Sequence, residues 1–282
     1  MQKEIEKNLT IENKGIYIDA TFGLGGHTQS LLKKISKESV LIAIDKDPVS
    51  IKIAKKMTLY ENRLKFHKGS FLSIKKIALK YGLKKKINHI IVDLGTSNFQ
   101  LKNKLGFGFS NNSFLDMRMN PNFGMPAYKW IDKISENQLS NILNSYGEEK
   151  HCKLIAKQIK KINSNKKINT TFQLIQIVKN SLPNKKHNKH FATRIFQAIR
   201  IALNNELYEL KRFLSIAPSL IKKGGYLSII SFHSLEDRII KNFFEKRYKH
   251  FNQIKKLKTK ENELIDNRQS RSAILRIFKR NL

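Results

Sequence analysis

The chain has 282 residues, 40% of them hydrophobic, which is enough for one large domain or for one domain with a smaller insert. No apolar run approaches the length of a membrane span, and the N-terminal segment is charged rather than apolar. The single cysteine, Cys152, excludes an internal disulfide and a cysteine-based metal site. These features predict a cytoplasmic protein with no membrane partner, and no metal-ligating residues are assigned.

The charge of the chain is strongly positive, with 55 Lys and Arg against 22 Asp and Glu and a formal net charge of +33. Such a surplus favours a polyanionic partner, because contacts to phosphates release counterions. Lysine, asparagine and isoleucine dominate the sequence, as happens when a genome drifts towards A+T-rich codons. We therefore attribute the positive surplus about equally to such a drift and to selection for nucleic-acid binding. An anionic membrane surface is a weaker alternative, since no long basic amphipathic helix is visible.

Short apolar runs in the first third of the chain predict strands at residues 16–20, 40–44, 64–67 and 87–94. A glycine-rich turn follows the first run, and Asp47-Pro48 opens a helix after the second. Strands that alternate with helices indicate an α/β fold, a doubly wound parallel sheet with helices on both faces.

The alternation then breaks, and the next clear strand covers residues 226–231. Parallel strands are normally joined by about a dozen or more residues, mostly one helix, so the longer gap predicts an inserted, mainly helical domain. We place this insert at residues 106–199, between residues 1–105 and 200–282 of the sheet domain. One long helix is expected over residues 192–213, and residues 272–278 are expected to pair at the sheet edge.

Three features fall at the expected carboxyl ends of neighbouring strands, where a doubly wound sheet binds its ligand. Gly25 and Gly26 allow a close approach of the backbone to a ligand. Asp45 ends the second strand, where a carboxylate can accept hydrogen bonds from both ribose hydroxyls, and Asp93 ends the fourth. A tight connection or a helix cap explains each feature alone, whereas their order indicates an adenosine-containing cofactor.

A nicotinamide-dependent oxidoreductase is the main alternative for this arrangement. Its G-x-G-x-x-G fingerprint places a pyrophosphate on a helix N-terminus. Here Thr28 takes the last position of that pattern and, with His27, forms a poorer pyrophosphate cradle. S-adenosylmethionine has no pyrophosphate, so the departure favours it. A non-catalytic RNA-binding or assembly protein that keeps the fold is a third possibility.

Longer motifs resemble the RsmH (MraW) family. They are DATFGLGGH at 19–27, IDKDP at 44–48, DLG at 93–95, GFS at 108–110, LDMRM at 115–119, ATR at 192–194, FQA at 196–198 and SFHSLEDR at 231–238. The resemblance implies a class I S-adenosylmethionine-dependent methyltransferase domain with an inserted helical domain. It further implies methylation of N4 of a cytidine in the decoding centre of 16S ribosomal RNA, with free RNA or the small ribosomal subunit as substrate.

The resemblance also implies the contacts of the cofactor. The turn formed by Gly25, Gly26 and His27 would lie against the methionine part of S-adenosylmethionine. Asp45 would hold the ribose, and Phe71 would pack on the adenine region.

Asp93 and Gln100 would lie near the amino-acid end of the cofactor and the reacting centre. Between them the chain departs from the family pattern, with Asn98 and Phe99 where the family has Ser-Pro, and Phe191 replaces a proline further on. No catalytic base is assigned.

Two segments, residues 106–121 and 231–233, are candidates for the pocket of the target base. Phe107, Phe109 and Phe232 would stack on the base, and Asp116, Arg118 and His233 would hydrogen-bond to it. The alternatives are core packing for the phenylalanines, a mutual ion pair for Asp116 and Arg118, and a helix cap for His233. Arg194 and Arg200 would face either RNA phosphates or solvent.

Overall fold

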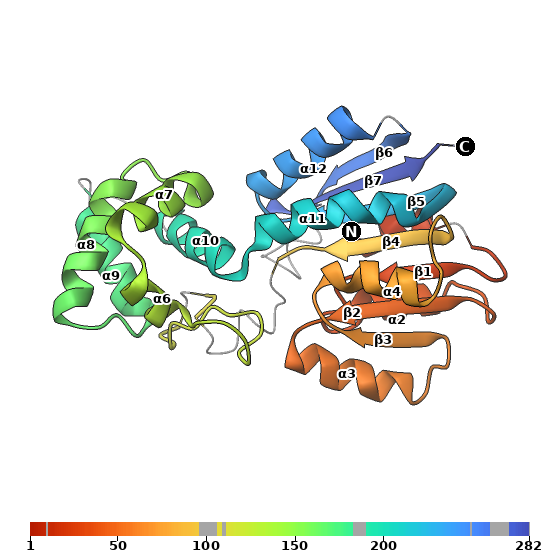
Figure 1. The fold of residues 1–282 in the computed structure, drawn as a ribbon, viewed down its shortest axis with the longest axis horizontal. Helices are drawn as coiled ribbons and strands as arrows, with labels where there is room; N and C mark the ends of the chain where they lie inside the picture. The colour runs from red at the N-terminus through yellow and green to blue at the C-terminus, as the bar shows by residue number, and fades with distance from the viewer. Residues whose placement is uncertain are drawn as a thin grey trace. The chain divides into compact units, whose positions relative to one another are not determined.

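The computed structural model describes residues 1–9, 11–95, 106–108, 111–182, 190–248, 250–259 and 271–281 (Figure 1). The chain divides into two compact units, here called the sheet unit (Met1–Gly95 and Tyr208–Leu282) and the inserted unit (Thr96–Leu207). The inserted unit therefore begins before the expected residue 106 and ends after the expected residue 199. Its later end has a physical reason, because the helix that contains residue 199 continues beyond it and buries Ile199 in the core of the inserted unit.

The sheet unit contains a seven-stranded sheet in the order β3-β2-β1-β4-β5-β7-β6. The strands are β1 (Ile16–Asp19), β2 (Val40–Asp45), β3 (Leu64–Lys68), β4 (Ile87–Asp93), β5 (Ile221–Ser231), β6 (Phe251–Lys258) and β7 (Ile274–Arg280). The strands from β3 to β5 in this order pair in parallel, and β7 pairs antiparallel with both of its neighbours. This confirms the doubly wound α/β fold.

The expectation that the last strand forms the edge of the sheet is wrong, because β7 lies between β5 and β6. Strand β6 takes the edge position, and no strand was expected there from the sequence. Its residues are mostly polar and exposed, as is usual for an edge strand that must not pair with another molecule.

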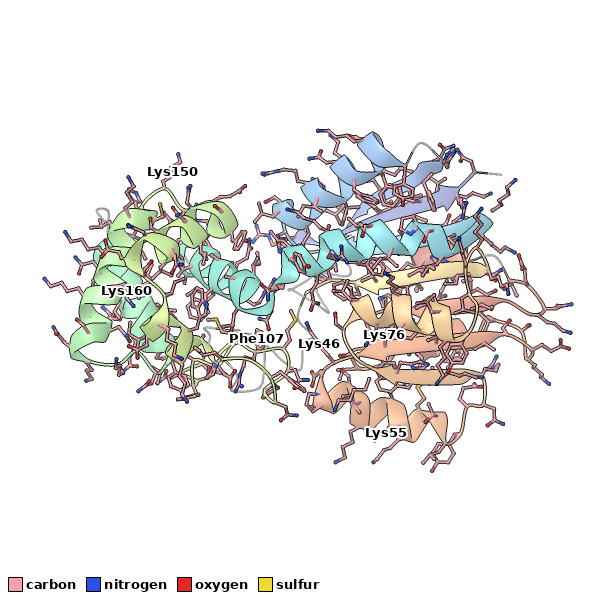
Figure 2. All side chains as sticks on the ribbon, viewed as in Figure 1. Lys46, Lys55, Lys76, Phe107, Lys150 and Lys160 are labelled. Carbon is pink, nitrogen blue, oxygen red and sulfur yellow. The ribbon has the colours of Figure 1, made fainter. Side chains whose placement is uncertain are left out.

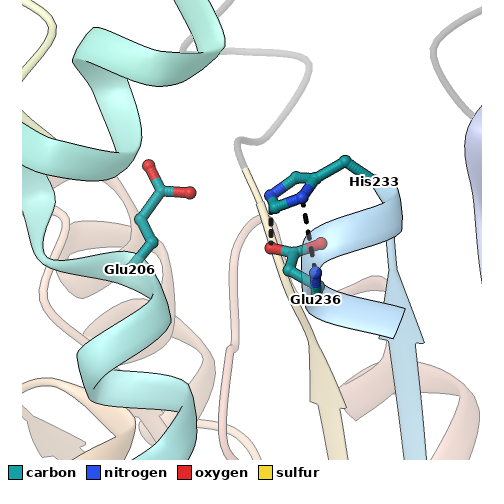
Figure 3. Close-up of side chains that lie close together, drawn as sticks. All are labelled: Glu206, His233 and Glu236. Atoms are coloured by element: carbon teal, nitrogen blue, oxygen red, sulfur yellow. Dashed lines mark hydrogen bonds and ion pairs between the residues drawn. The ribbon is translucent and has the colours of Figure 1, made fainter. Parts of the chain in front are cut away.

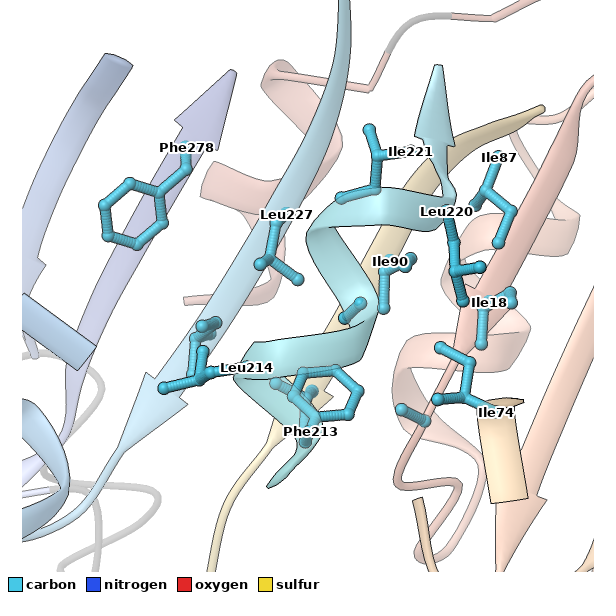
Figure 4. Close-up of a cluster of buried hydrophobic side chains, with 14 of the residues drawn as sticks. Ile18, Ile74, Ile87, Ile90, Phe213, Leu214, Leu220, Ile221, Leu227 and Phe278 are labelled. Atoms are coloured by element: carbon cyan, nitrogen blue, oxygen red, sulfur yellow. The ribbon is translucent and has the colours of Figure 1, made fainter. Parts of the chain in front are cut away.

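Helices cover both faces of the sheet. They are α1 (Gln2–Lys7), α2 (Gly26–Leu32), α3 (Pro48–Thr58), η1 (Phe71–Ser73), α4 (Ile74–Lys80), α11 (Glu206–Leu220) and α12 (Ser234–Arg247). Alternate strand residues enter two separate cores, as the strand period of two requires: Ile18 lies in one and Tyr17 in the other. Figure 4 shows the first core, in which Phe213 and Leu214 of α11 pack with strand residues such as Ile90.

The inserted unit is built of α6 (Ala127–Lys133), α7 (Glu136–Gly147), α8 (Cys152–Asn165), α9 (Thr171–Ser181) and α10 (His190–Asn204). The single helix expected over residues 192–213 is wrong: α10 and α11 are separated by Asn205, whose φ of 53° is left-handed. Asparagine adopts this conformation more readily than most residues. Among the residues described, none of the helices has the length and apolarity that crossing a bilayer requires.

Candidate cofactor site

The glycine turn connects β1 to α2 and has the backbone geometry that only glycine adopts easily. Gly23 and Gly25 have φ values of +57° and +85°. A Cβ atom placed on Gly26 would meet nothing within 4 Å. The backbone therefore borders open space at Gly26, whereas a Cβ on Gly25 would come within 2.9 Å of the Phe22 ring.

Asp45, at the end of β2, holds this turn in place through a hydrogen bond. Its Oδ2 accepts a hydrogen bond from the backbone N–H of Gly23 at 2.7 Å, and its Oδ1 accepts one from Asp47 at 2.8 Å. Burial raises the pKa of Asp45, and the two backbone hydrogen bonds offset this only in part. Ser50 also hydrogen-bonds to this carboxylate. The two oxygens together offer about four acceptor positions, so the group can still accept a hydrogen bond from a ribose hydroxyl.

Phe71 follows the end of β3 and begins the short helix η1. The N–H of Gly69 donates to the carbonyl of Asp45 at 2.8 Å, which joins the loop of Phe71 to the loop of Asp45. The Phe71 ring packs edge-on against Phe213 of α11, with centroids 5.4 Å apart. The predicted ribose and adenine contacts thus lie in directly connected loops.

Asp93 ends β4, and its backbone N–H donates to the Thr21 hydroxyl at 2.7 Å. Its Oδ2 lies 3.6 Å from Nε2 of His27. Its Oδ1 is buried and has no hydrogen-bond partner within the described part of the chain. This oxygen is therefore available to accept an N–H from a ligand.

The surroundings of His27 favour its charged form. Burial lowers the pKa of His27, but the hydrogen bond and charge of Asp93 and the charge of Asp19 outweigh burial and leave that pKa raised. Asp19 is itself fully buried and accepts hydrogen bonds from the Thr28 hydroxyl at 2.7 Å and from the N–H of Thr21 at 3.2 Å. Burial raises the pKa of Asp19.

Phe232, at the end of β5, lies directly against Gly95, two residues after Asp93. A Cβ on Gly95 would come within 3.1 Å of the Phe232 ring, and Gly95 has a φ of +99°. The ring is partly exposed. It is therefore positioned beside the end of β4, where a flat ligand could stack on it.

His233 is the N-cap residue of α12. Its Nδ1 accepts a hydrogen bond from the N–H of Glu236 at 3.4 Å, and its Nε2 lies 3.3 Å from Oε1 of the same residue (Figure 3). Glu236 Oε2 in turn accepts the N–H of Phe232 at 2.8 Å. The pair fixes the turn that presents Phe232.

In the inserted unit, Asp116 and Arg118 form a bidentate ion pair, with N–O distances of 2.7 and 2.8 Å. This is the ion-pair alternative for these residues. Phe107 is 6% exposed, as the core-packing alternative predicts. Phe109 and Gln100 lie outside the described residues.

Both candidate phosphate contacts have acidic partners. The Arg194 guanidinium lies 2.8 Å from Glu149, and Arg200 makes two hydrogen bonds of 2.9 Å to Glu206. Arg194 keeps half of its side chain exposed, so it is the better placed of the two to meet a further anion.

Comparison with known proteins decides the family. The model of the MraW methylase family matches residues 1–281. The chain belongs to this family. Several relatives are named ribosomal RNA small subunit methyltransferase H. The one from Buchnera aphidicola subsp. Baizongia pistaciae is 47% identical to this chain over 244 residues, which cover 86% of this chain and 77% of that protein. In Buchnera aphidicola subsp. Cinara cedri the identity is 43% over 98% of this chain and 96% of the relative, and in Vesicomyosocius okutanii it is 40% over 97% and 94%.

Membership of the MraW methylase family confirms the resemblance and the expected methyltransferase chemistry, with S-adenosylmethionine as methyl donor. A nicotinamide-dependent oxidoreductase is thereby excluded. Sequence reasoning assigned no role to three residues of this region: Lys46, Ser70 and Glu209 form a polar cluster beside Asp45 and Phe71.

Proposed function

We propose that this chain transfers a methyl group from S-adenosylmethionine to N4 of a cytidine in the decoding centre of 16S ribosomal RNA, within the small ribosomal subunit. Its relatives are named small-subunit rRNA methyltransferases. The motifs LDMRM at 115–119 and SFHSLEDR at 231–238 support the same substrate by resemblance.

The observation that carries this proposal is the buried, unpaired Oδ1 of Asp93 at the end of β4. The lone pair of cytosine N4 is delocalised into the ring, so a site that methylates it needs an acceptor for an N4 hydrogen and close alignment. A carboxylate oxygen with an unused lone pair supplies such an acceptor. We assign Asp93 to the reacting end of the site.

The residues that would hold the cofactor fit its chemistry. The open backbone beside Gly26 would face the methionine part, Asp45 would accept from the ribose, and the Phe71 ring would pack on the adenine. When bound, S-adenosylmethionine supplies the methyl group, whose bond to sulfur breaks as the N4 lone pair forms the new C–N bond and N4 gives up a proton.

The target base would stack on Phe232. An enzyme that modifies a base within folded RNA must unstack it and pack its faces against apolar side chains. Phe232 directly follows β5, and its partly exposed ring lies next to Gly95. The hydrogen bond from its N–H to Glu236 holds the backbone at this point.

We further propose that the inserted unit recognises the RNA. Lys153, Lys157 and Lys161 are exposed on α8, and their spacing of four places them on one face. Like charges at this spacing destabilise a helix, and α8 contains no acidic residue. Figure 2 shows lysines on the surface of both units, among them Lys55 on the sheet unit and Lys150 on the inserted unit. An RNA backbone would neutralise this face.

The inserted unit also has aromatic side chains at its surface. Phe114 is 47% exposed, and its ring centroid lies 4.8 Å from that of Tyr128. The ammonium group of Lys129 lies 5.9 Å from the centre of the Tyr128 ring. Unpaired RNA bases bind on such surfaces by stacking.

The decisive experiment supplies labelled S-adenosylmethionine and undermodified small ribosomal subunits to the purified chain. Nuclease digestion and mass spectrometry of the RNA should find the label in one N4-methylated cytidine of the decoding centre. Asp93→Asn, which puts an N–H donor in place of one acceptor, should retain subunit binding and lose most of the transfer. A chain that binds S-adenosylmethionine but leaves all small-subunit RNA unlabelled would disprove the proposal.

A further inference from the structure

We propose that Glu209 is a positioning residue for the adenosine half of S-adenosylmethionine. Its carboxylate holds together the two loops that carry Asp45 and Phe71. The inference rests on the proposed assignment of those two residues to the cofactor.

Glu209 lies in the part of α11 that belongs to the sheet unit, and its side chain is 18% exposed. Its Oε2 accepts hydrogen bonds from the Ser70 hydroxyl at 2.9 Å and from the Lys46 ammonium at 3.2 Å. Its Oε1 lies 3.4 Å from the same ammonium. One carboxylate thus has partners in two different loops.

The partners of Glu209 are the immediate neighbours of the proposed cofactor contacts. Lys46 follows Asp45, and Ser70 precedes Phe71. Because consecutive residues share a rigid peptide plane, holding Lys46 and Ser70 restricts where the Asp45 carboxylate and the Phe71 ring can lie. The hydrogen bond from Gly69 to the Asp45 carbonyl links the same two loops through the backbone.

A second contact of α11 supports the same role. Phe213 comes four residues after Glu209, so both side chains lie on one face of the helix. The Phe213 ring meets the ring of Phe71 edge-on at 5.4 Å. The α11 face therefore orients the Phe71 ring by an apolar contact and fixes its loop by a polar one.

A positioning role predicts a loss of cofactor affinity without a matching loss of stability. Helix α11 is attached to the sheet by buried side chains such as Leu210, Phe213 and Leu214, which a change at Glu209 leaves in place. Partly exposed ion pairs contribute little to folding. The two loops, by contrast, would lose their side-chain link and keep the backbone hydrogen bond from Gly69 to Asp45. The Asp45 and Phe71 side chains would then be less well ordered, and a bound cofactor would have to restore their order.

The test measures binding of S-adenosylmethionine and of 5′-methylthioadenosine to the full chain by calorimetry. Glu209→Ala should weaken both by about 10-fold, the usual effect of losing a hydrogen bond to a charged group. Glu209→Gln keeps an acceptor for Ser70, so its loss should be smaller. The KM for S-adenosylmethionine should rise, while kcat at saturating cofactor and the KM for the ribosomal substrate should stay near the wild-type values.

Glu61→Ala is the matched control. Glu61 forms an ion pair with Arg63 at 2.6 Å, and its side chain is 25% exposed. It precedes the start of β3, whereas the loop that Glu209 contacts follows the end of β3. This variant should leave both affinities unchanged.

Unchanged affinities in Glu209→Ala and Glu209→Gln, measured on folded protein, would overturn the role of Glu209 while leaving the proposed function intact. Weakened binding of S-adenosylmethionine with unchanged binding of 5′-methylthioadenosine would also overturn it, because the defect would then lie at the methionine end. If Glu209→Ala does not fold, the near-isosteric Glu209→Gln decides. Loss of RNA methylation in the wild-type chain, with its cofactor affinity intact, would count against the proposed function alone.

Discussion

The imidazole Nε2 of His27 lies 3.6 Å from Oδ2 of Asp93, and this contact joins the turn after β1 to the end of β4. The two strands are neighbours in the sheet, and buried Asp19 adds a second negative charge next to His27. The relationship gives the apo protein a pH dependence that does not require the cofactor.

His27 should stabilise the fold more at low pH than at high pH. Its pKa is raised in the folded chain, so the stabilisation is complete below the unfolded value of about 6.5 and disappears as the pH rises through the folded value. The difference in unfolding free energy between wild type and His27→Gln should therefore shrink from pH 6 upwards, as measured by urea denaturation. A difference that grows with pH would contradict this prediction.

His67 provides the opposite sign as a control. Burial, together with the charges of Lys80 and Lys65, lowers its pKa, so its protonation disfavours the folded state. The unfolded state then binds more protons near pH 6, and stability rises with pH through this range. Replacing His67 by Gln should remove that rise and leave the dependence due to His27.

Asp45 should be essential for cofactor affinity. Asp45→Ala removes the acceptor for the N–H groups of Gly23 and Asp47 as well as for the ribose. Loss of hydrogen bonds to a charged group costs about 1.5–3 kcal/mol, so the Kd for S-adenosylmethionine should rise by roughly 10- to 100-fold. Asp132→Ala breaks an ion pair with Lys167 in the inserted unit and should not change the Kd; equal effects of the two variants would argue against a ribose contact.

Gly95 should be intolerant of any side chain. Gly95→Ala combines a φ of +99° with a Cβ within 3.1 Å of the Phe232 ring, and we expect methyl transfer to fall sharply while binding of S-adenosylmethionine is largely kept. Gly82→Ala separates the two causes, because Gly82 has a φ of +60° but nothing within 4 Å of its Cβ. That variant should lose about 1–2 kcal/mol of stability and retain activity. Full activity of Gly95→Ala would exclude Phe232 from the site.

Asn204 should stabilise the inserted unit through the LDMRM loop. Its side-chain amide donates to the carbonyl of Met117 at 2.8 Å and accepts from the N–H of Met119 at 2.9 Å. Met117 is buried and has a left-handed φ of 58°, so these two hydrogen bonds hold the loop at a strained residue. Asn204→Ala should cost about 1–3 kcal/mol, seen as a lower unfolding temperature with unchanged cofactor affinity.

The exposed Asn180, which accepts a hydrogen bond from Gln176 of its own helix, serves as the control for this change. Asn180→Ala should leave the unfolding temperature close to that of the wild type. If both asparagine variants were equally stable, the loop would not depend on the amide of Asn204.

The strands β2 and β4 were predictable because each contains an apolar run, as in residues 90–92, and Asp45 and Asp93 mark their ends. Strand β6 was not, because polar residues interrupt its apolar residues and leave no apolar run. The break at Asn205 depends on one left-handed residue between two helical patterns. Glu209 was beyond sequence reasoning, since its partners Lys46 and Ser70 are 163 and 139 positions away along the chain.

The separation of the hydrophobic cores has a consequence for how such a protein can evolve. Each of the three core clusters lies wholly within one unit. A substitution that loosens the packing of the inserted unit therefore removes no contact from the core beneath the cofactor residues, and the reverse also holds. Lineages can accumulate changes in the helices of the inserted unit, or exchange those helices altogether, while they inherit the core of the sheet unit unaltered.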